Sequence, residues 1–144
     1  MINQEQLVHR ACIALTGLFR DQVEAQLECV HTRIFNYVLH PEYDYVHCGF
    51  SREAILGAPT QPEHVVPCSV LINESFRLIK EGNLSDSEIA MLLQKHWKIA
   101  TISRIEAKRI DLELGLKSRM PAGWRFEDGD TFVRLQQAEI ALET

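Results

Sequence analysis

The segment Asn3–Val30, NQEQLVHRACIALTGLFRDQVEAQLECV, sets the helical character of the fold. Its apolar residues recur at the three- and four-residue spacing that places them along one face of a helix: Leu7, Val8, Ala11, Cys12, Leu15, Leu18, Phe19, Val23, Leu27 and Val30. Asn3 can accept a hydrogen bond from the first turn, and Gln6 stands where a capping box carries its second side chain. We therefore expect a helix from about residue 4 to about residue 30.

Further helices are predicted in the second half of the chain. The stretch PCSVLINESFRLIKEG begins at Pro67, which suits a first helical turn, and ends at Gly82, which suits a helix C-terminus. The sequences SDSE (85–88) and SRIE (103–106) have the residue types of capping boxes. We expect each to open a helix, and we expect the second of these helices to close near Gly115.

Shorter elements are expected elsewhere. Ser51 can cap a short helix that ends near Gly57, where the loop GAPTQP begins. A short amphipathic helix is expected over about 132–142, after turns at MPAGW and EDGD. Three segments rich in aromatic and β-branched residues are predicted to be strands: RIFNYVL (33–39), YDYVHCGF (43–50) and WKIATIS (97–103).

Together these elements predict an α+β fold that is predominantly helical, with a long N-terminal helix, a few short strands and three to four further helices. The length of 144 residues suits a single globular domain spanning 1–144. The four cysteines are widely spaced and form no CxxC pair, so we expect reduced thiols. No apolar run has membrane-spanning length, and the N-terminus lacks a secretory pattern, so we expect a cytoplasmic protein that does not bind membranes.

The net charge of −5 conceals a basic segment at 95–125. Its basic residues are Lys95, Lys98, Arg104, Lys108, Arg109, Lys117, Arg119 and Arg125, against Glu106, Asp111 and Glu113. Local positive charge can attract phosphate even on an acidic protein. The candidate nucleic-acid contacts are Arg104, Lys108, Arg109 and Arg119, with Trp97 and Trp124 as bases for stacking. The alternative is a solvated helix face of mixed charge.

The stretch with the clearest potential for chemistry is QPEHVVPCSVLINE, from Gln61 to Glu74. In it, the carboxylate of Glu63 is followed directly by the imidazole of His64. A carboxylate is a hard oxygen ligand for a cation such as Mg²⁺. A neutral imidazole is a good general base near physiological pH. Hydrolysis of a phosphodiester uses both parts, but the same pair also fits a polar turn at the start of a helix.

The sequence EHVVP, with Asn73 nine residues after His64 and His96 farther on, resembles the motif of HNH, or ββα-metal, nucleases over residues 63–96. The resemblance implies that His64 is the general base and that Asn73 belongs to the catalytic set. It implies that Glu63 and His96 hold a divalent metal, Mg²⁺ or similar. We therefore expect Glu63 and His64 in a surface cleft, with His96 close enough to share a metal or phosphate.

Other functions remain open from the sequence. Four members of a second set could form a tetrahedral zinc site: His47, Cys48, His64, Cys68 and His96. No P-loop, GxGxxG, GxSxG or HExxH occurs, which disfavours nucleotide cofactors and serine hydrolase chemistry. The sequence thus predicts a metal-dependent HNH-like nuclease, or an inactive relative. The alternative is a non-catalytic interaction or inhibitor protein that binds a protein or nucleic-acid partner, with dimerisation through the first helix left open.

Overall fold

The structure is a computed structural model that describes residues 1–144, and its fold is α+β and predominantly helical, as predicted. The elements in chain order are α1 (Gln4–Glu24), α2 (Ile34–Val38), α3 (Glu42–Val46), β1 (His47–Ser51), α4 (Arg52–Ile55), β2 (Thr60–His64), α5 (Cys68–Glu81), α6 (Asp86–His96), β3 (Ile99–Ser103), α7 (Arg104–Lys108), the π-helical turn η1 (Arg109–Glu113), α8 (Val133–Gln137) and β4 (Leu142–Glu143). None of these helices has both the length and the apolar character that a membrane-spanning segment needs.

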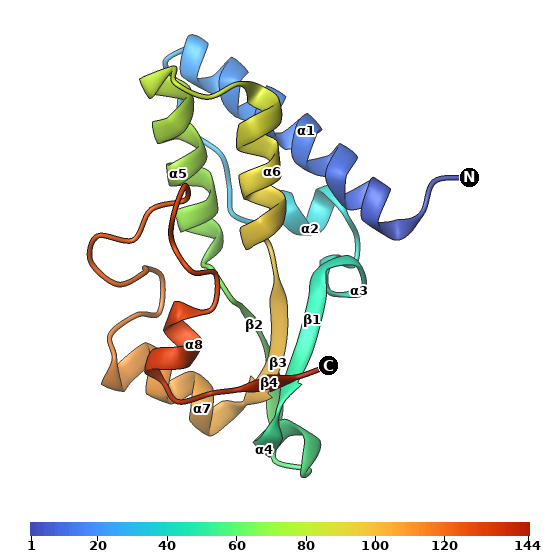
Figure 1. The fold of residues 1–144 in the computed structure, drawn as a ribbon, viewed down its shortest axis with the longest axis vertical. Coiled ribbons are helices and arrows are strands. Elements are labelled where there is room, and N and C mark those ends of the chain that lie inside the picture. The colour runs from blue at the N-terminus through green and yellow to red at the C-terminus, as the bar shows by residue number, and fades with distance from the viewer.

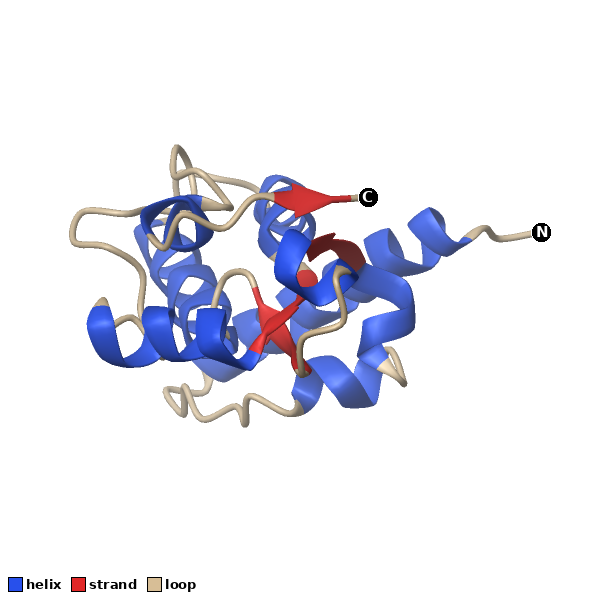
Figure 2. Ribbon diagram, turned by 90° about the horizontal axis from the view of Figure 1, so that it is seen from below, coloured by secondary structure: helices blue, strands red, loops and turns tan.

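The three longest helices form one end of the molecule and the sheet forms the other (Figure 1). α1 packs on α5 and α6, which also contact each other. α7 and α8 lie beside the sheet, and α4 lies at its far end. In the view from below, both chain termini lie on the same side of the molecule (Figure 2).

The local signals for helix starts are confirmed. Asn3 and Gln6 form the predicted capping box of α1, and the boxes at Ser85 and Ser103 open α6 and α7. Gly82 ends α5 in a left-handed conformation, with φ of 73°, which glycine adopts without steric cost. The helix α1 ends at Glu24, earlier than expected. Beyond it Leu27 is left 63% exposed, whereas Val30 packs against the hydrophobic core.

Two of the predicted strands are wrong in whole or in part. Residues 33–39 form α2 instead of a strand, and 43–50 divides into α3 and β1. The helical conformation places Phe35, which is fully buried, against Trp97 at a centroid distance of 5.1 Å. This tertiary packing outweighs the β-propensity of the segment. The expected loop 57–62 also contributes residues to β2.

The sheet has the strand order β2-β3-β1-β4. β1 is parallel to β3, whereas β2 is antiparallel to β3 and β4 is antiparallel to β1. β2 is an edge strand, which is where a sheet tolerates a proline such as Pro62. The register pairs His64 with Ile99 at one end of β2 and Thr60 with Ser103 at the other.

Two hydrophobic clusters meet at β3, all of whose residues are buried. Ile99 belongs to the larger cluster, which the long helices form. Ala100 belongs to a smaller cluster, to which the C-terminal segment (residues 114–144) contributes. Successive side chains of a strand point to opposite faces, so Ile99 and Ala100 mark the two faces of the sheet. Their partners His64 and Glu63 lie on these same two faces. The fold therefore separates the two side chains of the Glu63–His64 pair.

Candidate functional site

His64, at the end of β2, meets Glu42 and Cys68, which are the first residues of α3 and α5. Nε2 of His64 lies 3.0 Å from Oε2 of Glu42. One potential ligand atom from each of the three residues lies within 4.8 Å of the other two. The His64 side chain is 36% exposed and the Glu42 side chain only 7%. The imidazole of this Glu42–His64–Cys68 cluster is therefore open to solvent, while the carboxylate is shielded.

Glu42 is held in place by several hydrogen bonds. Its Oε2 accepts one from the indole Nε1 of Trp97 in addition to its contact with His64. Its backbone N–H donates to Oδ1 of Asn36 at 2.9 Å. A buried carboxylate is costly unless such partners compensate for the water it has lost. Glu42 is therefore a fixed acceptor, and it orients the ring of His64.

The charges around His64 favour its protonated form. Burial acts to lower the pKa of His64, but the adjoining Cys68 and Glu42 side chains outweigh burial and raise this pKa from 6.5 to about 10. His64 is accordingly an imidazolium at neutral pH.

Cys68 lies at the N-terminus of the 14-residue helix α5. Pro67 precedes it as the N-cap residue and makes no side-chain hydrogen bond to the helix. The Pro67 carbonyl accepts hydrogen bonds from the N–H groups of Val70 and Leu71. The N–H groups of Cys68 and Ser69 have no acceptor within the chain. Two free donors and the positive end of the helix macrodipole thus lie beside the Cys68 thiol.

The same three side chains could hold a metal ion. A thiolate, an imidazole and a carboxylate are all established zinc ligands, and three protein ligands leave one position of a tetrahedral ion for water. His64 would first have to lose its proton, because only the neutral ring binds metal. This set shares His64 and Cys68 with the zinc set considered from the sequence, and it adds Glu42.

Glu63 has a different environment from the one expected. It lies on the opposite face of the sheet from His64, and its Oε1 is 3.1 Å from Nη2 of the fully buried Arg134. Burial raises the pKa of Glu63, and Arg134 acts in the opposite direction. Because the strand turns the two side chains apart, Glu63 cannot contact an ion beside His64.

His96 and Asn73 also have roles that differ from those the resemblance implies. His96 is fully buried, and its Nε2 and Nδ1 make hydrogen bonds of 2.9 Å with the Phe126 carbonyl and the Thr131 hydroxyl. Asn73 lies in the middle of α5 with its side chain exposed. His64 makes no hydrogen bond with either residue. The structure therefore does not bring together the catalytic pair His64 and Asn73 and the metal ligands Glu63 and His96 that the nuclease resemblance implies.

None of the four candidate nucleic-acid contacts makes a hydrogen bond or ion pair with His64. Arg104 and Lys108 are exposed on α7, which begins at the end of β3 where Ser103 pairs with Thr60. His64 lies at the opposite end of that strand pair. The guanidinium groups of two further candidate contacts donate to main-chain carbonyls of the protein, Arg109 to Ala138 and Arg119 to Gly115.

Comparisons with protein-family models, with curated proteins and with solved structures find no match.

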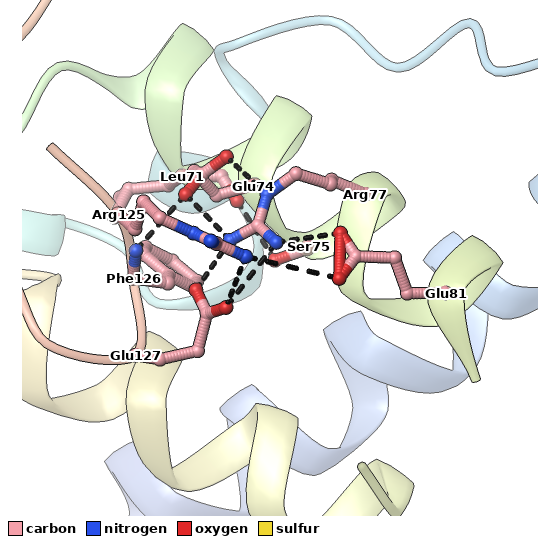
Figure 3. A network of polar contacts seen from close by, with 8 residues as sticks. All are labelled: Leu71, Glu74, Ser75, Arg77, Glu81, Arg125, Phe126 and Glu127. Atoms are coloured by element: carbon pink, nitrogen blue, oxygen red, sulfur yellow. Dashed lines mark hydrogen bonds and ion pairs between the residues drawn. The ribbon is translucent and has the colours of Figure 1, made fainter. Parts of the chain in front are cut away.

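An ionic network stabilises the segment that follows η1. Arg77 of α5 pairs with Glu74 and Glu81 of its own helix and with Glu127 of the C-terminal segment (Figure 3). Arg125, a member of the basic segment, pairs with Glu127 at 2.9 Å. Oε1 of Glu74 accepts a hydrogen bond from the Phe126 N–H. These charges attach the C-terminal segment to α5 and are engaged within the protein.

The surface around the cluster is open. The structure has three surface hollows, and none of them is lined by Glu42, Glu63, His64 or Cys68. The expected cleft at the Glu63–His64 pair is therefore not present. The imidazole and the Cys68 thiol are both partly exposed, so a large molecule as well as a small one can reach them.

Sequence reasoning identified His64 as a candidate and included Cys68 in a zinc set, but it missed Glu42. The carboxylate lies 22 residues before His64, between the two segments 33–39 and 43–50 that were expected to be strands. The proline that precedes Glu42 and the acidic first turn of α3 are the local signals for a helix start there. No spacing rule connects that helix start to His64.

Proposed function

We propose that Cys68 is the nucleophile of an acyl-transfer enzyme, most simply a hydrolase, in which His64 is the acid–base and Glu42 orients His64. One observation carries this proposal: a thiol at a helix N-terminus lies beside an imidazole that a buried carboxylate holds. Nucleophile, base and orienting group in this order form the general arrangement of covalent acyl transfer. The imidazole of His64 and the N-terminus of α5 are the immediate surroundings of this thiol.

The proposed reaction has two steps. The Cys68 sulfur attacks the carbonyl carbon of the acyl donor, a C–S bond forms, and the carbonyl electron pair moves onto oxygen. The free N–H groups of Cys68 and Ser69 are available to stabilise that oxyanion. As the oxyanion collapses, the leaving group departs with the proton of His64. Water then gives a proton to His64 and attacks the thioester, which releases the acid and restores the Cys68 sulfur.

The open surface favours large acyl donors over small ones. No hollow encloses the cluster, so little surface is available to bury a small substrate. A peptide or protein can obtain its binding energy from contacts outside the reacting group. We therefore propose an ester, thioester or amide carried on a macromolecule as the substrate class.

The test compares two thiols of the same chain. Cys29 is exposed and lies outside the cluster, so it serves as an internal control for Cys68. Iodoacetamide labelling, followed by peptide mapping, should show Cys68 reacting faster than Cys29 at about pH 6, where ordinary thiols are protonated. His64→Gln should slow Cys68 about tenfold or more and leave Cys29 unchanged. Equal rates for the two thiols at every pH would reject the proposed nucleophile.

An activity assay follows from the same variants. A chromogenic aryl ester should give a burst of phenolate that is stoichiometric with the protein, followed by slower turnover. Cys68→Ala should abolish the burst, and Glu42→Gln should reduce it while the fold is retained. A burst that persists in Cys68→Ala would contradict the mechanism.

A metal-dependent hydrolase is the second candidate, with the predicted nuclease activity on phosphodiesters as its specific form. It is favoured by the close approach of the three potential ligand atoms, within 4.8 Å of one another. Glu42, His64 and Cys68 would hold the ion, which would supply an activated water. A zinc-class ion suits this sulfur-containing set better than the Mg²⁺ expected from the sequence.

The two candidates are separated by their inhibitors. Single- and double-stranded DNA and RNA should be incubated with Zn²⁺, Mg²⁺, Mn²⁺ or EDTA, beside His64→Ala. Cleavage that EDTA and His64→Ala both abolish would favour the metal-dependent nuclease. Ester turnover that survives EDTA and is lost on alkylation of Cys68 would favour the thiol enzyme.

A further inference from the structure

Arg134 is the one fully buried arginine, and all three of its guanidinium nitrogens are engaged. Nη1 donates to the carbonyl oxygens of His64 and Val65, at 2.9 and 3.1 Å. Nε donates to the Leu116 carbonyl at 3.0 Å, and Nη2 is 3.1 Å from Oε1 of Glu63. Arg134 thus binds the main-chain carbonyls of His64 and Val65, the last residue of β2 and the residue that follows it.

That junction determines the geometry of the candidate site. Only residues 65–67 separate His64, at the end of β2, from Cys68, at the start of α5. Any rotation of the His64 or Val65 peptide changes the direction of the imidazole relative to the thiol. The other backbone restraint at Val65 is its N–H, which donates to the Lys98 carbonyl at 2.9 Å. Arg134 fixes the two carbonyls from the face of the sheet opposite the His64 ring.

We infer that Arg134 is a positioning residue that sets the orientation of His64 toward Glu42 and Cys68. It does so by binding the β2–α5 junction from the face of the sheet opposite the His64 ring. This inference rests on the proposed function of the cluster. Glu63 has a part in it, because its carboxylate balances the buried charge of Arg134 and keeps the guanidinium in register. Glu63 and His64 would then have linked roles. Glu63 would hold Arg134 in place, and His64 would face the substrate.

A planar guanidinium is needed for this task. It offers donors in a fixed fork, which can serve two adjacent carbonyls and a carboxylate together, whereas an ammonium group is a single point of charge. Arg134→Lys should therefore retain the charge beside Glu63 but hold the junction poorly. Arg134→Met should remove both functions.

The experiment measures His64 and Cys68 directly in folded protein. Histidine NMR titration should give the raised pKa of His64 in the wild type, a value about one unit or more lower in Arg134→Met, and an intermediate value in Arg134→Lys. Labelling of Cys68 by iodoacetamide at neutral pH should fall about tenfold in Arg134→Met, with partial recovery in Arg134→Lys. Labelling of Cys29 should not change.

The matched control is Arg109→Met. Arg109 also donates to a main-chain carbonyl, that of Ala138, but it has no contact with His64 or Val65. This variant should leave both the His64 titration and the Cys68 labelling rate at their wild-type values. A loss that merely reflects a weakened C-terminal segment would appear in Arg109→Met as well.

If Arg134→Met does not fold, Glu63→Gln replaces it, because the amide keeps the size and an acceptor while it removes the charge that orients Arg134. Folded Arg134→Lys and Glu63→Gln proteins with wild-type His64 titration and Cys68 labelling would overturn the inference. Failure of the proposed function has a different signature. In that case wild-type Cys68 would react no faster than Cys29, whatever residue stands at position 134.

Discussion

The indole Nε1 of Trp97 donates a hydrogen bond to Oε2 of Glu42, which lies 55 residues earlier in the chain. Both residues are buried, and the same carboxylate oxygen is 3.0 Å from Nε2 of His64. Trp97, which follows α6, thus positions Glu42 at the start of α3. Glu42 in turn positions His64 at the end of β2. The candidate site depends on this tertiary contact as much as on its own three side chains.

Trp97→Phe tests the energetic weight of that contact. Phenylalanine retains most of the apolar packing against Phe35 but removes the donor to Glu42. A buried acceptor that loses a partner costs about 1–3 kcal/mol, and urea unfolding should show a loss of that size. The matched control is Trp124→Phe, whose Nε1 donates to the Asp130 carbonyl at an exposed position. A loss in Trp124→Phe as large as that in Trp97→Phe would contradict the argument.

His64→Gln should alter how stability depends on pH on the alkaline side. The pKa of His64 is raised from 6.5 to about 10 in the folded chain, so the folded state binds this proton more tightly than the unfolded state. The resulting stabilisation is complete below pH 6.5 and is lost as the pH rises through about 10. The free energy of unfolding of the wild type minus that of His64→Gln should therefore fall across this range. A constant difference in urea unfolding would show that the pKa of His64 is not raised.

His96→Gln should have the opposite effect, on the acid side. Burial lowers the pKa of His96, so the unfolded chain takes up this proton more readily than the folded chain. The stabilisation is complete above pH 6.5 and is lost as the pH falls below that value. The wild type should therefore lose more stability on acidification than His96→Gln, as measured by thermal unfolding at a series of pH values. His31→Gln, at an exposed histidine, is the control and should follow the wild type.

The helix starts were predictable because their signals are local. Each of the capping boxes at Asn3, Ser85 and Ser103 is formed by side chains and N–H groups three residues apart. The interaction that stabilises such a start is contained in a short stretch of sequence, so tertiary contacts need not be known. The same holds for Gly82 at the end of α5.

The partners of His64 were not predictable, because they depend on which face of the sheet each residue occupies. The sequence shows that the side chains of Glu63 and His64 point in opposite directions if they lie in an extended strand. It does not show which of these two side chains lies on the same face of the sheet as Glu42. The helix α2 was missed for a related reason, since the packing of Phe35 against Trp97 that favours a helix there joins residues far apart in the sequence. His64 was identified from its own chemistry, whereas Glu42 gains a role only from its place in the fold.

Arg77→Met should destabilise the protein more than loss of an ordinary surface ion pair. Arg77 is 27% exposed and pairs with three carboxylates, those of Glu74, Glu81 and Glu127. Its removal leaves these like charges close together with only Arg125 beside Glu81 and Glu127, and it weakens the attachment of the C-terminal segment to α5, so we expect a loss of about 2 kcal/mol in urea unfolding. Arg20→Met removes a single pair with Asp86, whose side chains are 36% and 45% exposed, and should cost less than about 1 kcal/mol. Equal losses in the two variants would mean that the three pairs of Arg77 contribute no more than the single pair of Arg20.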